Sequence, residues 1–188
     1  MTETETKPKR KRRAHWIVWT LPMLLLIALP TANHFFVYQL FRQPSGSMQP
    51  TLHVGDTFAV SKWSYGYGRY SFAPFESPLG RGRVLSREPQ AGDIVVFRPV
   101  PEPDRSFVKR LIGMPGDHIQ MIDGVLHING VAVRRESLGV TEFENEDGLV
   151  ERVPAYRETL PNGVSYTTFD RTQRSEIDNT RVFVVPAG

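Results

Sequence analysis

The sequence predicts a mostly β protein, in which one N-terminal transmembrane helix precedes a β-rich domain of antiparallel sheets with an elaborated surface lobe. A single long apolar segment, residues 16–38, directly follows a basic tail. After it come short β-branched segments separated by turn dipeptides, and fifteen Gly and fifteen Pro interrupt any long helical pattern. We therefore divide the chain into a basic cytoplasmic tail (1–15), an anchor (16–38) and a folded domain (39–188).

Composition excludes several classes of protein. The 188 residues are 40% hydrophobic, which favours a packed core over a disordered chain. There is no cysteine, so a disulfide framework, Cys-ligated zinc, an iron–sulfur cluster and a thiol nucleophile are all excluded. Residues 1–13 carry six Lys/Arg and two Glu, or +4, so the other 175 residues sum to −1 of the net +3. The basic charge belongs to the tail, and we expect no nucleic-acid partner.

The apolar segment has the features of a membrane anchor. Trp16–Leu29 contains no charge, and the uncharged stretch continues to Phe41. A spanning helix needs about 20 mostly apolar residues, so it has to extend beyond Leu29. A cleaved signal peptide is the alternative, but Pro30 stands where its cleavage site requires a small residue. We favour a retained anchor, with Lys7–Arg13 keeping the N-terminus in the cytoplasm and the rest of the chain exported.

The domain reads as strands and turns. Asp123-Gly124 and Asn129-Gly130 are dipeptides typical of tight hairpin turns, and alternating apolar residues flank both. Residues 63–83 form a loop rich in Gly, Pro and aromatic residues, and residues 134–180 are polar enough to predict the surface lobe. The other predicted strands lie at 57–62, 93–97, 107–113 and 181–185.

Two serines and a glycine lie between two prolines just after the apolar segment, in Pro44-Ser45-Gly46-Ser47-Met48-Gln49-Pro50. Proline fixes φ and glycine permits close approach, so this segment predicts a rigid turn that presents a hydroxyl group. A simple linker between anchor and domain has the same composition, and composition alone favours it. His53 follows Ser47 by six residues, but a polar histidine in a turn explains it better than a Ser–His pair.

Outside the tail the chain has only two lysines, Lys62 and Lys109. Alternation along a strand places Lys109 on one face with Phe107 and Leu111. Such neighbours are expected to desolvate the amine, which favours its neutral form. A neutral lysine can take a proton from a serine hydroxyl, which arginine cannot do, and a Ser–Lys pair can replace Ser–His–Asp. The alternative is a surface lysine whose aliphatic stem lies along apolar residues.

Several segments taken in order resemble bacterial type I signal peptidase (leader peptidase). They are residues 45–52 (SGSMQPTL), 92–97 (GDIVVF), 108–110 (VKR), 113–117 (GMPGD) and 123–130 (DGVLHING). The tail and anchor also fit this family. The resemblance implies a membrane-anchored serine endopeptidase that removes signal peptides from exported preproteins. It would lie in the bacterial inner membrane, with its catalytic domain on the periplasmic side and preproteins and the lipid bilayer as partners.

The resemblance also implies the roles of individual residues. Ser47 resembles the nucleophile and Lys109 the general base, while the Ser45 hydroxyl and the Ser47 N–H resemble the oxyanion hole. Gln43 stands where the family usually has an apolar residue, and Phe107 replaces a frequent Tyr. The family has no cofactor and no metal. The residues that resemble the lining of its shallow pockets for small substrate side chains are Phe41, Gln43, Pro44, Met48, Leu52, Phe107 and Val108.

One family segment is not found in the sequence. A Gly-Asp-Asn-Arg segment with a following Ser normally comes soon after a Val-Pro-x-Gly turn, and here Val185-Pro186-Ala187-Gly188 is the last segment. We expect a truncated form of an active enzyme. Two alternatives remain open: an inactive, membrane-anchored binding or scaffold protein of the same fold, and a processing peptidase specific to conjugation or pilus substrates.

Overall fold

The structure is a computed structural model that describes residues 15–72, 82–99, 101–102, 104–145, 147–172 and 175–187. It is mostly β, and each sheet whose register is determined is antiparallel. This confirms the β-rich class and the antiparallel pairing predicted from the sequence. The chain divides into two compact units, one made of residues 1–39 and 61–86 and the other of residues 40–60 and 87–188. Of the basic tail predicted at 1–15, residues 1–14 lie outside the described residues.

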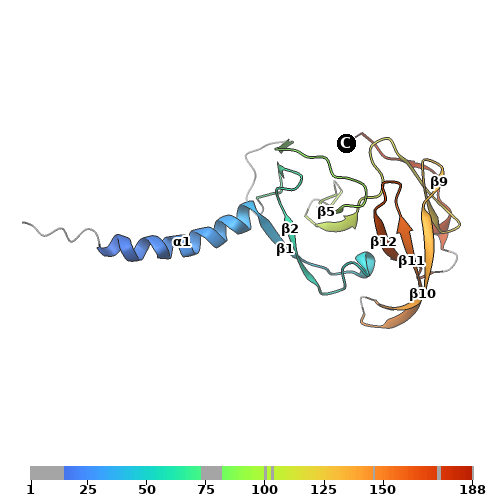
Figure 1. Cartoon of the computed structure of the whole chain (residues 1–188), viewed down its shortest axis with the longest axis horizontal. Helices are drawn as coiled ribbons and strands as arrows, with labels where there is room; N and C mark the ends of the chain where they lie inside the picture. The colour runs from blue at the N-terminus through green and yellow to red at the C-terminus, as the bar shows by residue number, and fades with distance from the viewer. Residues whose placement is uncertain are drawn as a thin grey trace, which may run out of the picture. The chain divides into compact units, whose positions relative to one another are not determined.

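The first unit contains helix α1 (His15–Phe36), drawn in blue in Figure 1. The helix coincides with most of the anchor predicted at 16–38. Pro22 and Pro30 lie inside it, and polar residues such as Asn33 occupy its last turns. In the part of the chain that the structure describes, no helix is long and apolar enough to span a membrane.

Short strands and aromatic side chains form the rest of the first unit. β3 (Tyr67–Gly68) pairs with β4 (Arg83–Val84), and the Tyr67 hydroxyl donates to the Phe36 carbonyl at 2.6 Å. The Phe72 ring stacks on Tyr67 and meets Phe36 edge-on, with both centroid distances 5.7 Å. These contacts attach the loop to the end of α1. Of the loop predicted at 63–83, residues 73–81 lie outside the described residues.

Two pairs of short strands and one 3-10 turn lead to the candidate site. β1 (Tyr38–Arg42) pairs with β2 (Thr57–Ser61), and η1 (Gly46–Met48) lies between them in sequence. β5 (Ile94–Phe97) pairs antiparallel with β6 (Phe107–Arg110), which places Val95 opposite Lys109. The predicted strands at 57–62 and 93–97 are confirmed within one residue at each end, whereas the strand predicted at 107–113 ends at Arg110.

A four-stranded sheet has the order β13-β7-β8-β9. Asp123 and Gly124 both have positive φ at the first turn, and Asn129 and Gly130 do so at the second, which confirms both predicted hairpins. The last strand, predicted at 181–185, is confirmed in part, since only two residues pair with β7. The strands of this sheet are β7 (His118–Ile122), β8 (Val125–Ile128), β9 (Val131–Ala132) and β13 (Phe183–Val184).

Residues 134–169 form a three-stranded sheet of order β10-β11-β12, which sequence reasoning did not predict. The strands lie side by side in Figure 1 and are β10 (Arg134–Glu144), β11 (Val150–Thr159) and β12 (Ser165–Phe169). A short 3-10 turn, η2 (Glu176–Asp178), follows them. Leu160, the residue just after β11, packs with Ile128 of β8 and with Val133, which lies between β9 and β10, in one core cluster.

Asp117 fixes the turn that precedes β7, and it predicts a dependence of stability on pH. Its carboxylate accepts from Met114 N and from Asn129 Nδ2, both at 2.8 Å, and the Asn129 bond leads the contacts that hold the pKa of Asp117 below its ordinary 3.8. A carboxyl group whose pKa is lower in the folded state than in the unfolded state stabilises the fold at pH values above its unfolded-state pKa. This stabilisation is lost as the pH falls through the folded-state pKa.

We therefore expect Asp117→Asn to destabilise the chain at about pH 6, and the difference from the wild type to shrink by about pH 3. Urea unfolding of both proteins at the two pH values measures this. Val131→Ala is the control, because an exposed apolar side chain should give a difference that does not depend on pH. An equal Asp117→Asn difference at both pH values would contradict the role of the carboxylate.

Candidate functional site

The serine segment forms a short rigid turn. Gly46–Met48 is one 3-10 turn, and Ser45 precedes it in an extended conformation, with φ −132° and ψ 156°. Met48 is buried and fixes the turn to the body, while Ser47 is exposed. Added to Gly46, a Cβ atom would lie 3.0 Å from the Phe143 ring, so this position favours glycine. The segment is thus a packed turn that presents the Ser47 hydroxyl, and not a simple linker.

Lys109 comes from β6 and reaches this turn from 62 residues away. Its Nζ donates to Ser47 Oγ at 2.5 Å, and Ser45 Oγ lies 3.1 Å from the same Ser47 oxygen. Val108, the preceding strand residue, is buried on the opposite face, as strand alternation requires. The structure therefore brings together an amine and two hydroxyl groups within hydrogen-bond distance.

Lys109 is exposed, so the apolar enclosure predicted from Phe107 and Leu111 is not found in the described part of the chain. The Phe107 ring turns toward Phe97 instead, at a centroid distance of 6.2 Å. Cross-strand pairing of β5 with β6 explains this, because Phe97 lies directly opposite Phe107.

Gln43 is buried beside the serine turn, with 1% of its surface exposed. Its Nε2 donates to the Ser45 carbonyl at 2.6 Å, its N–H donates to the Asp56 carbonyl, and its own carbonyl accepts from Gly55 N. Its Oε1 atom has no hydrogen-bond partner among the described residues. A buried unpaired acceptor costs about 1–3 kcal/mol, so the fold retains this side chain at a loss of stability.

The remaining residues predicted to line the substrate pockets have mixed environments. Met48 and Val108 are buried, while Phe41, Leu52 and Phe107 are half-buried and Pro44 is exposed. Phe41 stacks on Phe58, with 6.1 Å between ring centroids. Of these residues only Met48 lines the cavity described next.

A cavity of about 470 Å³ opens beside Ser47 and Lys109. Its far wall is the edge strand β12 together with Phe143 from β10. Sequence reasoning missed this wall, since no motif marks it. The lining residues that had not been predicted include Gln49, Arg110, Phe143, Tyr166 and Arg171.

Arg110 joins β6 to three other segments at the cavity. Its guanidinium donates to the Gly92 carbonyl at 2.7 Å and to Thr51 Oγ1 at 3.2 Å, and it lies 4.8 Å from the Tyr166 ring centroid. Burial raises the pKa of Tyr166, and the nearby Glu158 carboxylate adds to this effect, so the phenol stays protonated at neutral pH. Arg110 therefore fixes the strand that carries Lys109 to the segment just after Ser47.

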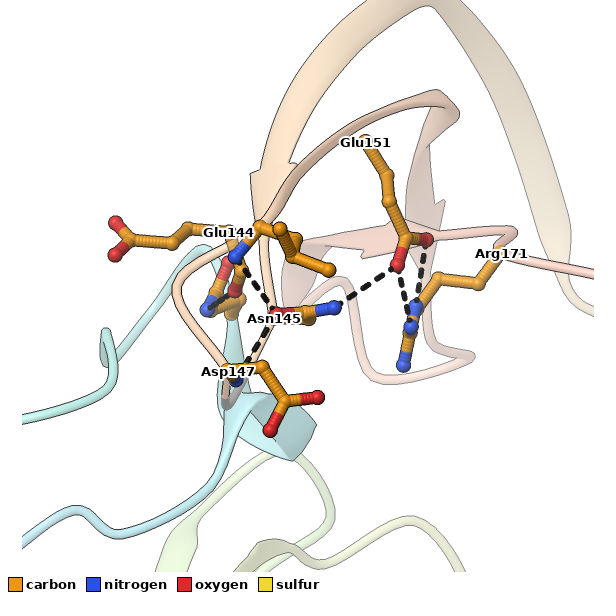
Figure 2. A network of polar contacts seen from close by, with 7 residues as sticks. Glu144, Asn145, Asp147, Glu151 and Arg171 are labelled. Carbon is orange, nitrogen blue, oxygen red and sulfur yellow. Dashed lines mark hydrogen bonds and ion pairs between the residues drawn. The ribbon is translucent and has the colours of Figure 1, made fainter.

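The end of the β10–β11 hairpin supports the serine turn. Asn145 lies at the centre of a network of polar contacts at this end (Figure 2). Its Oδ1 atom accepts from Asp147 N and from Leu149 N, and its Nδ2 atom donates to Glu151 Oε1. The Glu144 carbonyl accepts from the side chain of Gln49 at 2.7 Å, which joins the hairpin to the residue after η1.

Arg171 completes this network at the rim of the cavity. Its guanidinium donates to both oxygens of Glu151, the shorter contact being 3.0 Å (Figure 2). This hydrogen bonding holds the pKa of Glu151 below its usual range. The same guanidinium lies 4.5 Å from the centroid of the Phe143 ring. Among the described residues there is no cluster of His, Asp or Glu that could hold a metal ion.

Comparison with known proteins gives consistent matches. The family model described as "Signal peptidase, peptidase S26" matches residues 13–187. The chain is 37% identical to "Signal peptidase I" of Rickettsia akari (strain Hartford) over 195 residues, which cover 100% of this chain and 71% of that relative. The chain is also 39% identical to "Signal peptidase I" of Rickettsia prowazekii (strain Madrid E) over 170 residues, which cover 87% of this chain and 63% of that relative.

Proposed function

Since this chain belongs to the signal peptidase family, peptidase S26, we propose that it is a serine endopeptidase that removes signal peptides from exported preproteins with a Ser47–Lys109 dyad. The contact between Lys109 Nζ and Ser47 Oγ is the observation that carries the proposal. A serine hydroxyl is a weak nucleophile until a neighbouring base removes its proton, and an amine at this distance is placed to do so.

The proposed reaction begins with a preprotein bound in extended form beside the serine turn. Its backbone covers Lys109 and excludes water, which favours the neutral amine. Lys109 then takes the Ser47 proton, and Ser47 Oγ attacks the carbonyl carbon of a small residue, whose bond to the next nitrogen breaks. The same lysine returns the proton to the leaving amine, and a water molecule later hydrolyses the acyl-enzyme.

The negative charge on the tetrahedral intermediate requires donors. We assign this role to the Ser45 hydroxyl and the Ser47 N–H, the pair that the family resemblance implies. A donor of this kind is worth about 3–4 kcal/mol in the transition state. The 3.1 Å separation of the two serine hydroxyls supports this assignment, because it keeps Ser45 beside the reacting oxygen.

We further propose that α1 associates with the lipid bilayer of the bacterial inner membrane, with the folded domain on the exported side. The described apolar side chains of the helix are exposed, from 48% for Leu25 to 78% for Trp19. Such a surface on a single helix favours burial in lipid, and the basic segment 7–13 in front of it favours anionic headgroups. Holding enzyme and preprotein at one surface raises the rate at which they meet.

The test is cleavage of a purified preprotein by the full chain in lipid vesicles, with the new N-terminus identified by mass spectrometry. We expect cleavage after a small residue, and no cleavage by Ser47→Ala, whose circular dichroism should match that of the wild type. Cleavage by Ser47→Ala at the wild-type rate would disprove the serine mechanism. Binding of the preprotein without cleavage by the wild type would favour the inactive binding protein instead.

A further inference from the structure

We infer that Gln43 is a positioning residue, whose side chain holds the Ser45–Ser47 turn in its reactive conformation. This inference rests on the proposed function, in which Ser45 and Ser47 act on the substrate. It differs from the role in substrate pockets expected from the sequence, because Gln43 is almost fully buried and points its Nε2 group at the Ser45 carbonyl.

The backbone of Gln43 provides a fixed base for this contact. Its N–H donates to the Asp56 carbonyl and its carbonyl accepts from Gly55 N, both at 2.8 Å. Pro44 has no N–H, so the next residue cannot add a backbone donor of its own. The amide side chain of Gln43 supplies the missing donor and connects the fixed backbone directly to Ser45.

The contact acts on the chemistry through Ser45. The Ser45 carbonyl belongs to the peptide that leads into η1, so its direction sets where the turn begins. The Ser45 hydroxyl lies 3.1 Å from Ser47 Oγ, which in turn is 2.5 Å from Lys109 Nζ. A displacement of about 1 Å in such an arrangement can reduce the rate about 100-fold.

The unpaired Oε1 atom is the second, independent observation. Buried polar atoms nearly always have a partner, and exceptions concentrate where a strained arrangement serves function. Methionine has a similar length and no polar group to satisfy, so it would fill the same space without an unpaired acceptor. If Gln43 only filled space in the core, the polar Oε1 atom would be a cost without a benefit. If Gln43 positions the turn, the amide group is needed because its Nε2 atom is the donor to Ser45.

Gln43→Met in the full chain separates the two roles. We expect kcat for preprotein cleavage to fall about tenfold with KM changed less than twofold, while the melting temperature stays the same or rises. The matched control is Ile128→Val, which removes one methyl group from a buried residue of the core cluster that does not line the cavity. It should lower the melting temperature and leave kcat unchanged. An unchanged kcat in Gln43→Met, or a fall in kcat together with the melting temperature, overturns the inference.

Amide hydrogen exchange at Gly46, Ser47 and Met48 tests the inference without substrate. We expect exchange about tenfold faster in Gln43→Met than in the wild type, and unchanged in Ile128→Val. Equal exchange in wild type and Gln43→Met overturns the inference, whatever the activity. If the wild-type chain shows no Ser47-dependent cleavage, the proposed function fails, and faster exchange in Gln43→Met still supports the positioning role.

Discussion

Lys109→Arg is expected to abolish cleavage, although the substitution preserves charge and approximate length. Arginine does not lose its proton in proteins, so it cannot accept one from Ser47. A positioned general base contributes on the order of 10²–10⁴-fold to the rate, and we expect kcat/KM to fall by at least that much. The fall should be in kcat rather than KM, because the proposed role of Lys109 is to act on the serine and not on the bound peptide.

A second lysine variant separates the role of Lys109 from a general effect of replacing lysine by arginine. Lys62→Arg is the matched control, since Lys62 is the other lysine outside the basic tail, and it should retain the wild-type rate. A Lys109→Arg protein that cleaves as fast as Lys62→Arg would show that another group removes the proton.

Phe143→Ala is expected to cause the largest loss of stability. The side chain is 4% exposed, meets Phe169 edge-on at 6.0 Å and packs against Gly46 of the serine turn. Removing a buried phenylalanine ring lowers the free energy of unfolding by about 3–5 kcal/mol. The whole free energy of unfolding of a domain is about 5–15 kcal/mol, so this loss is a large fraction of it. Urea unfolding followed by fluorescence measures the difference in the free energy of unfolding.

Two variants sharpen this measurement. Val140→Ala lies on the same strand with 59% of its surface exposed, so it should change stability by about 0.5 kcal/mol or less. Phe143→Leu keeps an apolar side chain against Gly46 and should cost less than the alanine variant. A loss below about 1 kcal/mol for Phe143→Ala would mean that the hairpin does not support the serine turn.

Local features of the fold could be predicted, because they depend on neighbouring residues. The two hairpins around β8 follow from Asp123-Gly124 and Asn129-Gly130, whose positive φ values such dipeptides adopt easily. The β5 strand follows from a compact β-branched segment. The proline-flanked serine turn and the lysine among apolar residues suggested Ser47 and Lys109 separately. The order of family-like segments joined them into a pair, since no local pattern links residues 62 positions apart.

The three-stranded sheet could not be predicted for a physical reason. Its strands carry charges on both faces, and the apolar alternation that marks a half-buried strand is interrupted, for example by Pro154 between Val153 and Ala155. Arg135 on β10 faces Glu158 on β11, and Glu158 is buried because cross-strand partners compensate its charge. Pairing between distant strands, rather than composition, buries these residues.

The hydrogen bond from Gln49 to the Glu144 carbonyl spans 95 residues of sequence. Contacts between residues so far apart form late in folding, because the intervening chain has to be ordered first. During synthesis on the ribosome, Ser47 emerges long before the hairpin that braces it. A nascent chain therefore carries an unassembled site, and we expect the proposed peptidase activity only after most of the polypeptide has been translated and folded.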